Sequence, residues 1–81
     1  MTEEEIRTTV LRVLASIAPE LDPAAIRPDV SFRDQLDLDS MDFLNFVIAL
    51  HEELGVEIPD EDASKLATLD GCVEYLAAGL R

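Results

Sequence analysis

The chain has 81 residues, of which 18 are acidic and six are basic, so its formal net charge at neutral pH is −12. This charge argues against nucleic acid as a partner, because nucleic-acid phosphates attract lysine and arginine. No apolar run is close to the length of about 18 residues that is needed to cross a membrane. The first residues are acidic, whereas a secretory signal would begin with basic residues. Cys72 is the only cysteine, so no internal disulfide can form. We expect one domain over residues 1–81, monomeric, cytoplasmic and without a membrane partner.

The first helix is expected over residues 3–18. Thr2 and Glu5 have the spacing of a capping box, and apolar residues then recur at helical intervals as far as Pro19. Residues 19–39 contain three prolines and are expected to be a long, ordered connection with one helical turn at 23–26 opened by Asp22. Apolar side chains would pin this connection to the rest of the fold: Leu21, Ile26, Val30, Phe32 and Leu36.

The second helix is expected over residues 40–54. Asp39 is a favourable N-cap, and Asp42 lies three residues later, where a carboxylate can reach back to the first turn. Ser40 is then the first helical residue, with an exposed hydroxyl. A phosphate attached to this hydroxyl would lie against the positive end of the helix and its unpaired N–H groups.

The second helix carries two apolar faces on a helical wheel. One face is expected to lie in the core and consists of Phe43, Phe46, Val47, Leu50 and Leu54. The other face is a short stripe on the Ser40 side, made of Met41, Leu44 and Ile48, with His51, Asn45 and Glu52 beside it. This stripe could pack on a neighbouring helix or could face a partner.

The rest of the chain is also expected to be helical. Gly55 is a suitable left-handed C-cap, a short helix is expected over residues 60–65, and Thr68 opens a last helix. Its inward side chains would be Leu69, Val73, Leu76 and Leu80, with Cys72 as a small buried residue. No segment alternates with period two. The expected fold is all-α: a small antiparallel four-helix bundle with a short third helix and a long loop between helices 1 and 2.

Acidic residues are concentrated around the second helix. The window from Asp34 to Ser64 holds ten acidic residues and no lysine or arginine. This distribution favours a partner with a basic docking surface, although it could also be a solvated face that keeps the protein soluble.

The segment Asp39-Ser40-Met41-Asp42, followed by an apolar helix, resembles the Asp-Ser-(Leu or Met)-(Asp or Glu) signature of acyl carrier proteins. The family's spacing continues from Leu50 to Asp62 and from Leu69 to Tyr75, so the resemblance covers about residues 28–78. It departs at Asp37, where the family commonly has glycine, at Asn45, which replaces a frequent glutamate, and at Phe43, which is bulkier than usual.

The resemblance implies that Ser40, next to Asp39, carries 4′-phosphopantetheine, and that acyl groups are bound as thioesters to its terminal thiol. Partners would be a phosphopantetheinyl transferase and acyl-processing enzymes. The recognition face would comprise Met41, Asp42, Leu44, Asn45, Ile48 and Glu52. The protein would be a freestanding carrier in fatty acid, polyketide or related acyl metabolism, with no catalytic residue of its own. A peptidyl or D-alanyl carrier is the alternative.

Other chemistry fits the residues less well. Ser40 and His51 share a face but are 11 residues apart, about 16 Å along a helix, which is too far for a hydrolytic pair. Asp37, Asp39 and Asp42 suggest calcium, but an EF-hand loop starting at Asp37 lacks its ligands or its glycine at three positions, and no metal site is expected beyond weak surface binding. An acidic helical adaptor would not need an exposed serine at a helix start.

Overall fold

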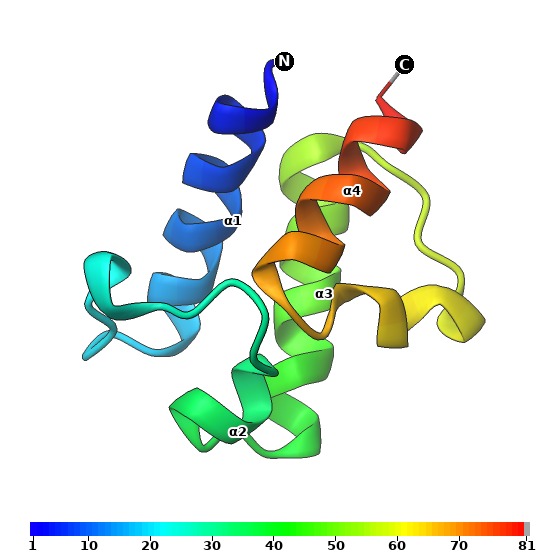
Figure 1. The fold of residues 1–81 in the computed structure, drawn as a ribbon. Coiled ribbons are helices and arrows are strands. Elements are labelled where there is room, and N and C mark those ends of the chain that lie inside the picture. Colours follow the sequence, from blue (N-terminus) through cyan, green and yellow to red (C-terminus); the bar gives the residue numbers. More distant parts are fainter. Residues whose placement is uncertain (81) are drawn as a thin grey trace.

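The computed structural model describes residues 1–80, which contain four α-helices and two 3-10 segments but no strand (Figure 1). The elements are α1 (Glu3–Ile17), η1 (Pro23–Ala25), α2 (Phe32–Leu36), α3 (Ser40–Leu54), η2 (Asp60–Leu66) and α4 (Leu69–Gly79). In Figure 1, α1 runs opposite to α3 and α4, so α1 begins and α4 ends at the same end of the bundle. The small all-α bundle expected from the sequence is confirmed.

One apolar core lies between the three long helices. α1 packs against both α3 and α4. It contributes Ile6, Val10 and Leu14, whose side chains are almost completely buried. The core continues through Phe46 and Leu50 of α3, Leu66 of η2 and Leu69, Cys72, Val73 and Leu76 of α4. Within residues 1–80, no helix is long and apolar enough to cross a membrane.

The connection before α3 differs from the expectation, because it contains a second helix. Only the turn at 23–26 was expected there; it is present as η1, with Asp22 Oδ1 accepting from the Ala24 N–H at 3.0 Å. Beyond it, α2 spans five residues. This helix is too short to show an apolar period, and its N-cap Ser31 makes no side-chain bond, so neither usual sequence signal marks it.

Phe32 anchors α2 to the core. Its side chain is fully buried and meets the ring of Phe46 edge-on, with centroids 5.4 Å apart. The backbone is tied down as well, since the Phe32 N–H donates to the Ala67 carbonyl at 2.8 Å. The side chain of Gln35 closes the preceding loop by bonding to Arg27 and Val30 backbone groups at 2.8–2.9 Å. Of the expected apolar tethers, Leu21, Ile26, Phe32 and Leu36 contact the core.

The segment after α3 follows the sequence expectation closely. Gly55 has φ of +66° and ends α3 as a left-handed cap. The short helix is a 3-10 segment, and the hydroxyl of Tyr75 in α4 donates to Asp62 in this segment at 2.8 Å. One expectation is wrong: Leu80 is 37% exposed and does not point inward, because α4 has ended at Gly79.

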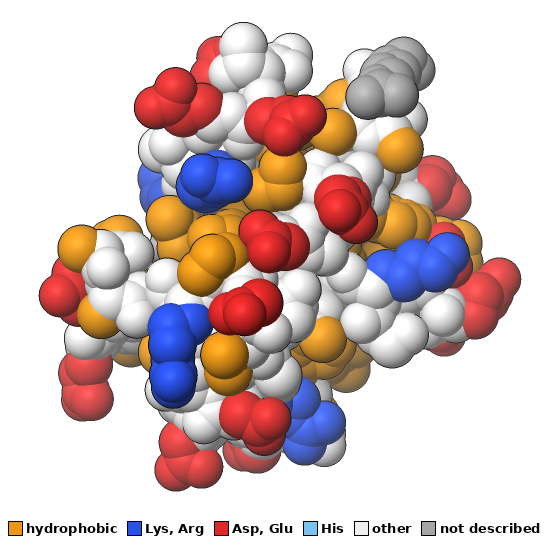
Figure 2. Space-filling model, in the orientation of Figure 1, with side chains coloured by type: hydrophobic (Ala, Val, Ile, Leu, Met, Phe, Trp, Pro, Cys, Tyr) orange, Lys and Arg blue, Asp and Glu red, His pale blue; other side chains and the backbone are white. Residues whose placement is uncertain are grey.

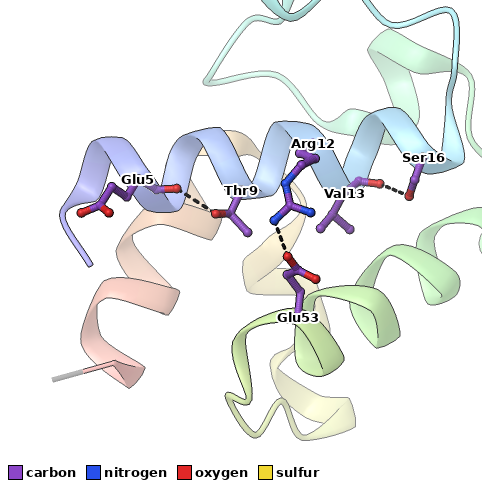
Figure 3. Close-up of polar contacts among 6 residues, drawn as sticks. All are labelled: Glu5, Thr9, Arg12, Val13, Ser16 and Glu53. Atoms are coloured by element: carbon purple, nitrogen blue, oxygen red, sulfur yellow. Dashed lines mark hydrogen bonds and ion pairs between the residues drawn. The ribbon is translucent and has the colours of Figure 1, made fainter.

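A surface ion pair also joins α1 to α3. Figure 3 shows the Arg12 guanidinium meeting the Glu53 carboxylate between the two helices. Both side chains are well exposed, so solvent screening leaves this pair little effect on stability. The hydroxyls of Thr9 and Ser16 bond to carbonyls of their own helix, Glu5 and Val13. The bundle therefore depends on its apolar core rather than on polar contacts between helices.

Replacing Phe32 with alanine should destabilise the bundle by about 3–5 kcal/mol, because it empties a fully buried site and frees α2. The matched control is Phe43→Ala, which removes a half-buried ring at the edge of the same cluster and should cost clearly less. Urea unfolding followed by circular dichroism measures both. If Phe32→Ala does not fold, the pair Phe32→Leu and Phe43→Leu gives the same ranking. Equal losses would show that α2 is not anchored through Phe32.

Candidate functional site

The start of α3 is fixed by a reciprocal pair of hydrogen bonds. The Asp39 carboxylate accepts from the Asp42 N–H at 2.8 Å, and the Asp42 carboxylate accepts from the Asp39 N–H at 3.3 Å. The expected capping box is thus confirmed, and Ser40 is the first helical residue. Its side chain is exposed at the positive end of a helix of 15 residues.

The turn between α2 and α3 brings a basic residue to this serine. Asp37 adopts a left-handed conformation with φ of +55°, and its N–H donates to the Arg33 carbonyl. The Arg33 side chain reaches across the turn, and its Nη2 donates to Ser40 Oγ at 3.4 Å. Arg33 could not be identified from the sequence, because it lies one residue before the window from Asp34 to Ser64 that lacks lysine and arginine, and because α2 was not expected. Its position at the edge of that window was the available signal.

The two faces of α3 are separated as the wheel predicted. Phe46 and Leu50 are 0% exposed, whereas Met41, Leu44 and Ile48 are 62%, 47% and 46% exposed. Asn45 and Glu52 are exposed beside this stripe, and Asp42 is half-buried by its capping role. Packing of the stripe on a neighbouring helix of residues 1–80 is therefore excluded. The stripe and Ser40 form one continuous surface along α3.

A shallow groove of about 370 Å³ runs beside the stripe. Leu44, Val47 and Ile48 line it from α3, and Ile58 and Pro59 line it from the segment that follows. Because its walls are mostly apolar, the groove extends the apolar part of the surface away from Ser40.

His51 lies on the Ser40 side of α3 but at the far end of the helix. It is exposed, and its Nδ1 lies 2.7 Å from the Val56 carbonyl oxygen. A carbonyl only accepts, so Nδ1 carries the proton. This bond holds the turn after Gly55, and His51 is too distant to activate Ser40 as a nucleophile.

The surface is predominantly acidic. Figure 2 shows acidic side chains over the whole visible face, with few basic ones between them. Among residues 1–80, no three His, Cys, Asp or Glu side chains are arranged to hold a metal ion. The carboxylates of Asp39 and Asp42 are used in the capping box instead.

Comparison with known proteins gives the family. The family model described as "Phosphopantetheine attachment site" matches residues 5–76, most of the chain. The chain belongs to the acyl carrier protein family. It is 41% identical to the acyl carrier protein of Lactobacillus johnsonii, over 94% of each chain. It is 36% identical to the mitochondrial acyl carrier protein 2 of Arabidopsis thaliana, over 96% of this chain but only 61% of the plant protein's length.

Solved structures agree in fold. A solution structure of a candidate acyl carrier protein from Anaplasma phagocytophilum superposes with a TM-score of 0.83 at 31% identity, covering 96% of this chain and 91% of the other. The acyl carrier protein of Enterococcus faecalis gives a TM-score of 0.76, also at 31% identity, covering 98% and 99%.

Membership of this family defines the kind of molecule. Acyl carrier proteins use a 4′-phosphopantetheine prosthetic group and are carriers rather than catalysts. In general they interact with a phosphopantetheinyl transferase and with acyl-processing enzymes. The start of α3 fits the group, because an exposed serine oxygen lies at a helix N-terminus with a guanidinium beside it.

Cys72 should not compete with an attached thiol. Burial raises the pKa of its thiol to about 12, and its Sγ donates to the Leu66 carbonyl at 3.3 Å. At about pH 8 its ionised fraction is then about a thousandfold below that of an exposed thiol, so labelling of the folded, unmodified protein by a thiol reagent should be slower by that factor. Labelling in urea should be fast, and Cys72→Ala should remain unlabelled in urea. Fast labelling in native buffer would contradict the burial.

Proposed function

We propose that Ser40 is the attachment site of 4′-phosphopantetheine and that the protein presents acyl groups to biosynthetic enzymes. The supporting observation is the exposed Ser40 hydroxyl at the first position of a capped helix, within a chain matched by the phosphopantetheine family over residues 5–76. When bound, the group supplies a terminal thiol that forms thioesters with acyl groups. A thiol requires a reducing compartment, and the free Cys72 is compatible with the cytoplasm as that compartment.

The contribution of this chain to attachment is presentation of the nucleophile. The Ser40 oxygen forms a bond to the phosphorus that bears pantetheine, the nucleotide half of coenzyme A leaves, and the hydroxyl proton passes to a base on the transferase. The capping box keeps Ser40 from fraying out of the helix, and the positive end of α3 stabilises negative charge that develops on the phosphoryl oxygens.

Partner recognition is proposed to use the exposed side of α3. Met41, Leu44 and Ile48 provide apolar contacts that set how long a partner stays bound, since buried apolar area mainly changes dissociation. Asp42, Asn45 and Glu52 border them, within a window that contains no lysine or arginine. Long-range attraction from this window would guide enzymes with basic docking surfaces to the helix.

We further propose a freestanding, monomeric carrier that serves fatty acid, polyketide or related acyl synthesis. Both kinds of pathway need the same thioester chemistry, so the acyl group must be identified directly. Intact-mass measurement of the protein isolated from its native host reports the arm and its cargo together.

Incubation with coenzyme A and a promiscuous phosphopantetheinyl transferase should add the mass of one arm, located on Ser40 by fragmentation. Ser40→Ala should keep its helical circular dichroism and gain no mass. The control is Ser64→Ala, which changes an exposed serine outside a capped helix start and should be modified like the wild type. Mass gain by Ser40→Ala would exclude the proposed site.

Leu44→Ala and Ile48→Ala should each lower the efficiency of this modification about tenfold, because they remove apolar contacts with the transferase. They should change the free energy of unfolding by no more than about 1 kcal/mol, because both side chains are half exposed. Leu50→Ala is the matched contrast: the same truncation at a fully buried position of the same helix should cost about 2–5 kcal/mol. Urea unfolding and transferase kinetics are measured side by side. If both stripe variants are modified at the wild-type rate, the transferase does not recognise the protein through Leu44 and Ile48.

A further inference from the structure

Arg33 is the basic group nearest to the proposed attachment site. It lies seven residues before Ser40, and the left-handed turn at Asp37 folds α2 back so that the guanidinium reaches the serine hydroxyl. The Nη2 to Oγ distance of 3.4 Å is long for a hydrogen bond to a neutral hydroxyl, so this contact by itself contributes little.

The guanidinium of Arg33 is also available for a stronger partner. In residues 1–80, the ion pairs are those of Arg12 with Glu53 and of Lys65 with Asp62, and neither involves Arg33. Four carboxylates follow Arg33 as far as the first turn of α3. Asp39 and Asp42 are engaged with backbone N–H groups in the capping box, and Asp34 and Asp37 form neither of these ion pairs. A positive charge is therefore present beside Ser40 in an otherwise acidic region, without a carboxylate bound to it.

We propose that Arg33 binds the phosphodiester that attachment creates on Ser40, and so positions the first bonds of the arm. This inference rests on the proposed function. Attachment replaces the hydroxyl hydrogen by a phosphoryl group, whose anionic oxygens then lie two bonds beyond the atom that Arg33 already contacts. A planar guanidinium matches two such oxygens, and a charge-assisted bond of this kind is stronger than the bond to the hydroxyl.

Local charge gives this contact a function. The phosphodiester adds one negative charge to a chain whose net charge is already −12, at the edge of its most acidic window. Without a cation, repulsion from the surrounding carboxylates would destabilise the modified form and push the arm away from the surface. Arg33 compensates for the added charge at the point where it appears, so the arm leaves α3 in a restricted direction.

The test compares wild type with Arg33→Gln, Arg33→Lys and Arg7→Gln, each before and after attachment. Arg7→Gln is the matched control, because it removes the same charge from an exposed position in the first half of α1. The start of α1 lies at the end of the bundle opposite the start of α3 (Figure 1). Intact mass first verifies one arm on Ser40 in every variant. Phosphorus NMR of the phosphodiester and the change in melting temperature on attachment are then measured at low and high salt.

The phosphodiester resonance of Arg33→Gln should shift relative to wild type and Arg7→Gln. Attachment should lower the melting temperature of Arg33→Gln by about 2–4 °C more than that of Arg7→Gln at low salt, with the difference shrinking at high salt. Arg33→Lys should restore the wild-type change in melting temperature on attachment, because lysine keeps the positive charge. It should restore the wild-type resonance position only in part, because lysine lacks the planar guanidinium that can bind two oxygens at once. If Arg33→Gln matches Arg7→Gln in both measurements, the role of Arg33 is wrong. If wild type gains no arm on Ser40, the proposed function itself fails.

Discussion

The geometry of the site depends on the hydrogen-bonded box between Asp39 and Asp42. These bonds fix the start of α3 and hold Ser40 inside the helix, where a constant rotation of about 100° per residue sets its direction relative to every later side chain. With Ser40 as the first residue, Phe46 and Leu50 turn into the core while Leu44 and Ile48 turn to solvent. Without this box the first turn could fray, and the direction of the serine relative to these faces would no longer be fixed. One local interaction thus links the proposed attachment residue to the surface that partners would contact.

The same helix has to satisfy opposing demands. Its buried face belongs to a small core in which Phe32, Phe46 and Leu50 are completely enclosed, and this burial must offset the repulsion of a chain with a net charge of −12. Its outer face leaves three apolar side chains in water. The long connection before α3 is held by backbone hydrogen bonds around α2, including the one from the Phe32 N–H to the Ala67 carbonyl. It therefore does not need to pack on the outer face of α3.

Much of this organisation could be predicted from the sequence, because it depends on local rules. Caps at Thr2, Asp39 and Thr68 mark the three long helices, and the apolar period of α3 separates its faces correctly. Predictions failed where tertiary contacts decide the outcome. α2 exists because Phe32 reaches the core, and a five-residue helix leaves no period to detect. Leu80 continues the apolar spacing of α4 but lies beyond its end. The His51 bond to Val56 and the Arg33 bond to Ser40 both cross turns, whose conformation sequence spacing does not give.

The charge distribution separates two tasks that would otherwise conflict. An acidic surface attracts basic partner enzymes over a distance of about one Debye length, roughly 10 Å at 0.1 M salt, but the same surface repels a phosphodiester attached within it. A single cation beside the proposed attachment atom would resolve this conflict, since its effect on a directly bound phosphate is strong while its effect on the distant field of a charge of −12 is small. The left-handed residue Asp37, where the family commonly has glycine, is what lets α2 deliver that cation to Ser40. In this chain, the conformation of one loop residue therefore connects the backbone turn, the placement of Arg33 and the electrostatics of the carrier site.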